Sequence, residues 1–311
     1  MSKASHLPAR WRSEHAVTRH NEAIADILET PPILHQNEPL VLCARVGTAQ
    51  VLAFLVAIKS LRARLGRGRI AVLDDGTLTA QDRAILAHHC GDPEIIRLRE
   101  ITTAPFPKTD DWASLLTVLE RREREYWLQV DCASVTLGPL PEIATAIARN
   151  RSFVCLANGS EGGPQKLSSL IDAPLSTDGK LAQIEASLAQ MPGAKRWHYA
   201  RIAPGLTGFN ASSGGRALAD MARQAMQAAA PDSARDNAAN TMPDGPDHVR
   251  AAANFVLANE RHGDILPDDR YVMEGEGENA KAAFFAFPTA FEAANEAFIR
   301  ASRLAIDALK V

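Results

Sequence analysis

Polar segments stand at the ends of three predicted strands, and they contain groups that bind phosphate or metal ions. They comprise Arg45, Gly47 and Thr48 at the end of the first strand, Asp74 and Asp75 at the end of the second, and Asp131 at the end of a later one. Guanidinium groups and exposed backbone N–H groups bind phosphate, whereas carboxylates hold hard divalent cations. For Asp131 a purely local interpretation competes, because an aspartate after a strand often only turns the chain.

The elements that must position these groups alternate between strands and helices. Apolar runs predict strands at Leu40–Val46, Arg69–Leu73, Glu94–Leu98 and Tyr126–Val130, with amphipathic helices between them. This alternation predicts an α/β fold with a mostly parallel sheet flanked by helices. Ligands bind at the carboxyl ends of the strands in such sheets, where all three polar segments are expected to lie.

The second half of the chain is less regular. A strand is expected at Phe153–Leu156 and a helix at Lys180–Met191. Tyr199–Ile202 leads into the glycine-rich stretch Gly205–Gly215, which precedes another helix. Helices are then expected at Arg216–Ala229, Val249–Asn259 and Thr289–Leu309.

The N-terminal region differs in composition from the rest. Residues 1–37 are polar and charged, with one amphipathic helix expected at Trp11–Leu28, and they form a helical extension. No composition shift divides residues 38–311, which we therefore expect to form one domain.

Composition excludes several classes of protein. The formal net charge of −3 provides no basic field for nucleic acid. The longest apolar run, Val51–Ile58, is eight residues long, well short of the roughly 20 that a membrane span requires. The four cysteines are widely spread and suit buried free thiols, so we expect a cytoplasmic protein. Neither a GxGxxG fingerprint nor a Walker A sequence occurs.

Four further segments share a pattern in chain order: Gln129–Glu142, Gly208–Ala211, Asp247–His248 and Ile265–Tyr271. Together they resemble bacterial glycosyltransferases of the GT-A fold, close to family 8. In that family a strand ends in a Leu-Asp-Ser-Asp-Thr type sequence, followed by Leu-Gly-x-Leu-x-Glu. The resemblance implies a GT-A-like domain with a nucleotide-binding half at residues 38–138 and an acceptor and sugar half at residues 139–311.

The resemblance also implies an activity of the hexosyltransferase type. A sugar would pass from a nucleotide-diphosphate donor, with a UDP-sugar expected, to a hydroxyl group of a glycan or another acceptor. Asp247 would contact the donor sugar, and transfer would occur near Asn210. Donor binding would fall to Arg45, Gly47, Thr48, Asp74, Asp75 and Asp131.

The metal motif departs from the family pattern. Its Asp-x-Asp places two carboxylates on one side of an extended segment, where they hold Mn²⁺ or Mg²⁺. Here Ala133 replaces the second carboxylate, and Ala283–Pro288 lacks the family's C-terminal histidine. Asp131 remains as the single metal ligand, so the metal would be bound weakly, by Asp131 and the substrate. Arginine is the alternative group for neutralising the diphosphate.

Two hypotheses follow from the resemblance and its departures. The first is a glycosyltransferase that uses a nucleotide sugar. The second is a non-catalytic binding or scaffold protein that keeps the fold and has lost the metal site.

Overall fold

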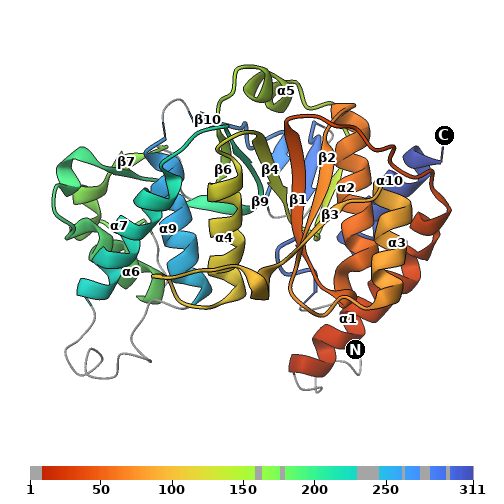
Figure 1. The fold of residues 1–311 in the computed structure, drawn as a ribbon, viewed down its shortest axis with the longest axis horizontal. Helices are drawn as coiled ribbons and strands as arrows, with labels where there is room; N and C mark the ends of the chain where they lie inside the picture. The colour runs from red at the N-terminus through yellow and green to blue at the C-terminus, as the bar shows by residue number, and fades with distance from the viewer. Residues whose placement is uncertain are drawn as a thin grey trace.

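A seven-stranded sheet forms the centre of the protein (Figure 1). The computed structural model describes residues 9–157, 163–175, 179–229, 245–260, 263–273, 281–291 and 295–310. Strand order is β10-β6-β9-β4-β1-β2-β3, and every pairing is parallel except the two made by β9. The expected α/β fold with a mostly parallel sheet is thus confirmed. The strands are β1 (Leu40–Val46), β2 (Arg69–Asp74), β3 (Glu94–Arg97), β4 (Tyr126–Val130), β6 (Phe153–Leu156), β9 (Ile202–Phe209) and β10 (Asp264–Ile265).

Helices cover both faces of this sheet, and each layer encloses its own hydrophobic cluster (Figure 1). On one side lie α1 (Ala9–Ala23), α2 (Val51–Leu65), α3 (Ala80–Cys90) and α10 (Glu296–Leu309). On the other lie α4 (Asp110–Arg121), α6 (Gly179–Ala189), α7 (Gly215–Ala228) and α9 (Pro246–Ala258). The short helix α5 (Pro141–Ala148) sits at one end of the sheet.

The glycine-rich stretch at residues 205–215 contains the second half of β9, a strand that was not predicted from the sequence. β9 lies between β4 and β6 and is antiparallel to both. A Cβ atom at Gly208 would lie 2.3 Å from the Phe153 ring and 2.4 Å from the Tyr126 hydroxyl oxygen. The glycine there permits close packing within a strand, whereas in the sequence it resembles a loop signal.

Several smaller elements differ from expectation. The expected helix at Trp11–Leu28 is α1 followed by a 3₁₀ turn at Ala25–Glu29, and α10 begins at Glu296. Two small sheets, not foreseen, pair β5 (Ser134–Thr136) and β11 (Tyr271–Val272) with β12 (Phe284–Ala286), and β7 (Gln165–Lys166) with β8 (His198–Tyr199).

Two expectations about composition can be compared with the structure. All four cysteines are buried and free, as expected. Across the described part of the chain, no helix combines the length and apolar character needed to cross a membrane.

Candidate functional site

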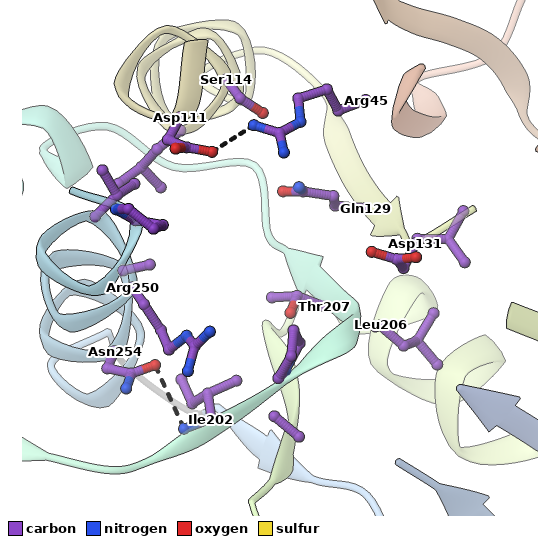
Figure 2. A pocket seen from close by; sticks show the side chains of 18 of the residues that line it. Arg45, Asp111, Ser114, Gln129, Asp131, Ile202, Leu206, Thr207, Arg250 and Asn254 are labelled. Atoms are coloured by element: carbon purple, nitrogen blue, oxygen red, sulfur yellow. Dashed lines mark hydrogen bonds and ion pairs between the residues drawn. The ribbon is translucent and has the colours of Figure 1, made fainter. Parts of the chain in front are cut away.

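A pocket of about 300 Å³ opens at the carboxyl ends of β1 and β4 (Figure 2). The chain continues from β1 to β2 and β3 on one side, and later places β4 on the other side of β1. The order of the strands therefore reverses at this point, which is where open α/β sheets form a ligand crevice. The wall is completed by β9, by the N-terminal part of α4 and by one face of α9 from Pro246 to Leu257.

Asp131 immediately follows β4, and its carboxylate faces this pocket (Figure 2). Its backbone N–H donates to the Gly205 carbonyl at 2.9 Å, which ties the end of β4 to β9. Its Oδ1 accepts a hydrogen bond from the Ala133 N–H at 2.7 Å. The residue is exposed toward the pocket and otherwise surrounded by protein. This burial raises the pKa of Asp131, against the opposing effects of the Ala133 N–H and Arg45.

Arg45 reaches the pocket from β1, where it is the one exposed residue of the strand. Its guanidinium forms an ion pair with Asp111, which lies in the first turn of α4. Both side chains remain partly accessible, and Figure 2 shows them at the rim together with Ser114 and Gln129. Arg45 therefore enters the pocket with its charge already opposed by a carboxylate.

A second guanidinium comes from Arg250 on α9, a residue not identified from the sequence. It lines the pocket and has no ion-pair partner among the described residues. One turn further on, the buried Asn254 accepts from the Ile202 N–H at 3.3 Å and donates to the Tyr199 hydroxyl at 3.2 Å. These bonds fix α9 against the start of β9. No local feature of the sequence distinguished Arg250 from the other charged residues of the predicted helices.

Four of the residues predicted to bind the donor do not line the pocket: Gly47, Thr48, Asp74 and Asp75. The Thr48 hydroxyl donates to Asp82 at 2.7 Å, and its N–H donates to the Thr77 hydroxyl at 3.0 Å. At Gly47, a Cβ atom would lie 2.3 Å from an Asp75 carboxylate oxygen. Gly47 and Thr48 therefore hold the end of β1 against the turn that follows β2.

Asp74 and Asp75 also stabilise the turn that follows β2. Asp74 is fully buried, forms an ion pair with Arg83 at 2.5 Å and accepts from the Gly76 N–H at 2.7 Å. Asp75 accepts from the Thr77 N–H at 2.9 Å. Their carboxylates thus make local hydrogen bonds of the type that stabilises turns.

The two predicted catalytic residues are not brought together at the pocket. The Asn210 N–H donates to the Ser152 hydroxyl at 3.1 Å, past the end of β9. Asp247 lies in the first turn of α9, with a carboxylate oxygen 3.9 Å from the Lys180 ammonium nitrogen. Neither lines the pocket, although Pro246, adjacent to Asp247, does.

The pocket's donor set does not fit a divalent cation. Within the described ranges, no group of three or more His, Cys, Asp or Glu residues could hold a metal ion. Asp131 already accepts from Ala133, and Asp111 is paired with Arg45. The Cys132 thiol donates to the Arg45 carbonyl at 3.2 Å, and its pKa is raised far above the usual value, mainly by burial. Hard cations need several oxygen ligands, which these residues do not supply together.

Solved glycosyltransferases are among the structures whose folds are similar to this chain, as the sequence resemblance predicted. The galactosyltransferase LgtC, in complex with donor and acceptor sugar analogs, is 12% identical with a TM-score of 0.48, over 85% of this chain and 95% of its own. Mouse xyloside xylosyltransferase 1 is 8% identical with a TM-score of 0.41, over 80% of this chain and 97% of its own. The mannosyltransferase Ktr4p from S. cerevisiae is 9% identical with a TM-score of 0.41, over 97% of this chain and 93% of its own.

These similarities concern the fold alone. No protein-family model and no curated protein sequence matches the chain. Membership of family 8 and a role for the remaining Asp131 of the metal motif stay predictions.

Proposed function

We propose that the protein is a glycosyltransferase whose pocket binds a nucleotide-diphosphate sugar, with a UDP-sugar as the expected donor. The observation that carries the proposal is the pocket at the strand-order reversal, with guanidinium groups from Arg45 and Arg250 at its wall. Planar guanidinium groups bind phosphate oxygens through paired hydrogen bonds. The sequence resemblance to GT-A glycosyltransferases supports the same class of ligand.

The proposed reaction moves the sugar from the diphosphate to an acceptor hydroxyl group. The bond between the sugar's anomeric carbon and the diphosphate oxygen breaks, the acceptor oxygen bonds to that carbon, and the acceptor proton passes to the departing diphosphate. Negative charge grows on the departing diphosphate, where a fixed guanidinium lowers the barrier. We assign this role to Arg250 and Arg45. Asp131, which faces the same cavity, is assigned to hydroxyl groups of the donor sugar.

The other predicted residues have supporting places in this proposal. Gly47, Thr48, Asp74 and Asp75 shape the turns next to the donor. Because Asn210 and Asp247 do not line the pocket, the proposal gives neither of them a direct part in transfer.

A second candidate function is donor binding without catalysis. It is favoured by Ala133 in place of the second metal ligand and by β12, an apolar strand where the resembled family has its histidine segment. Both candidates use the same pocket, so they differ in turnover and not in binding.

Calorimetry and donor turnover together test the two candidates. The wild type, Arg250→Ala and Arg300→Ala are titrated with UDP, UDP-glucose and UDP-galactose, and release of UDP is then followed with mixed glycan acceptors. Arg300 is exposed on α10, in the helix layer opposite the pocket, and is the matched control. A transferase should bind the donor and release UDP, and Arg250→Ala should weaken binding by about tenfold or more and slow the release of UDP. Binding without release supports the second candidate, whereas absence of binding to all three compounds contradicts both.

A further inference from the structure

We infer that this pocket neutralises a bound diphosphate with Arg250, assisted by Arg45, and without a divalent cation. The inference rests on the proposed function, since it concerns how the same donor is held. It assigns Arg250 a role in binding the donor that the sequence resemblance does not assign to it.

The place of the missing metal ligand is closed by packing. Ala133 is 2% exposed and belongs to the hydrophobic cluster on the α2 side of the sheet. Its carbonyl accepts from the Phe287 N–H at 2.8 Å, next to the pairing of β5 with β12. Its own N–H donates to Asp131. The backbone N–H and carbonyl groups of Ala133 are therefore both hydrogen-bonded, and its side chain faces apolar groups.

The charges of the pocket leave one cationic group available. The lining contains the arginines Arg45 and Arg250 and the aspartates Asp111 and Asp131. Asp111 is paired with Arg45, whereas Arg250 has no carboxylate partner in the described part of the chain. Arg250 is also exposed, so its guanidinium can meet an anion without breaking an existing ion pair.

The backbone around the pocket also favours a bound anion. The pocket lining includes residues from the first turns of α4 and α9, namely Asp111 on one side and Pro246 and Val249 on the other. Helix N-termini carry partial positive charge and favour anions. Figure 2 shows Arg45 and Arg250 entering from different sides of the cavity, an arrangement suited to a ligand with two phosphate groups.

Calorimetry with UDP, and separately with GDP, tests the inference in buffer containing either excess EDTA or MnCl₂. The wild-type dissociation constant for UDP should differ by less than about threefold between the two buffers. Arg250→Ala should weaken binding by about tenfold or more in both, as expected for the loss of a charged hydrogen-bonding group. The affinity of Arg250→Lys for UDP should lie between those of the wild type and Arg250→Ala, because an ammonium group cannot bind phosphate in the same paired geometry. Arg300→Ala should bind like the wild type.

The possible outcomes separate this inference from the proposed function. Binding that tightens by about tenfold or more with Mn²⁺ overturns the inference and leaves the proposed function standing. An Arg250→Ala protein that binds UDP as the wild type does also overturns the inference. If neither UDP nor GDP binds in either buffer, the proposed function itself fails. Circular dichroism of each variant confirms that the exposed substitutions leave the fold intact.

Discussion

At the scale of single residues, the charge that the pocket offers to a ligand depends on which of its charged side chains already form ion pairs. Arg45 is opposed by Asp111 across the rim, whereas Arg250 is not opposed by any described carboxylate. Arg45 and Asp131 were identified from their places at the ends of strands, and both line the pocket. Arg250 lies within a helix, where one arginine among many exposed charges gives no local sign of its surroundings.

Removing the charge of Asp111 should strengthen diphosphate binding. In Asp111→Asn, Arg45 is released from its ion pair, and one negative charge leaves the pocket. UDP should bind about two- to fivefold more tightly, the range expected for a partly exposed charge pair. Calorimetry measures the change. Asp110→Asn removes an exposed charge from the same helix turn outside the pocket lining and is the control. Weaker binding by Asp111→Asn, or an equal gain in the control, contradicts the charge assignment.

At the scale of elements, β9 joins the two parts of the sheet and supplies one wall of the pocket. Its pairing with β4 places Leu206 beside Val130, next to Asp131. Its pairing with β6 places Gly208 beside Phe153. Glycine is rare in strand interiors, so the local composition gave no sign of this strand. The close approach of Tyr126 and Phe153, which only the assembled sheet creates, explains the glycine.

A side chain at Gly208 should therefore destabilise the fold. The methyl group of Gly208→Ala would overlap the Phe153 ring and the Tyr126 hydroxyl, and overpacking of this kind costs about 1 to 3 kcal/mol in free energy of unfolding. Urea unfolding measures the loss. Gly179→Ala is the control, because a Cβ atom at the start of α6 would meet no described atom within 4 Å. Equal stability of Gly208→Ala and the wild type would show that β9 does not pack in this way.

At the scale of the whole molecule, the two ends of the described chain lie side by side on one face of the sheet (Figure 1). Arg19 of α1 forms an ion pair with Glu296 of α10, and the Ser13 hydroxyl donates to the Phe291 carbonyl at 2.6 Å. The His20 ring stacks on Phe298 with ring centroids 4.0 Å apart. The described part of the N-terminal extension thus packs on the rest of the protein, while the division at residues 37 and 38 stays a prediction.

Acid should weaken this contact through His20. Burial lowers the pKa of His20 from 6.5 to about 4, so the folded state favours the neutral ring. The contribution of the neutral His20 ring to the free energy of unfolding is fully present above pH 6.5. It is lost as the pH falls toward 4, and the loss is at most about 3 kcal/mol. The free energy of unfolding of His20→Gln should therefore fall less over this range than that of the wild type.

Urea unfolding at several pH values measures this difference. His15→Gln, on an exposed residue of the same helix, is the matched control and should follow the wild-type profile. Parallel profiles for His20→Gln and the wild type would show that His20 does not link the two ends in a pH-dependent way.

The sequence by itself determined the alternation of strands and helices, the α/β class and the polar groups at strand ends. These features depend on local periodicity and on short segments such as the capping box at Thr79 and Asp82, which the structure contains. Only the tertiary structure decided that β9 inserts between β4 and β6 and that Arg250 faces Asp131 across a cavity. The reason is physical: strand pairing and helix packing bring together residues far apart in the chain, such as Trp127 and Phe209 in adjacent strands, and no local pattern records such contacts.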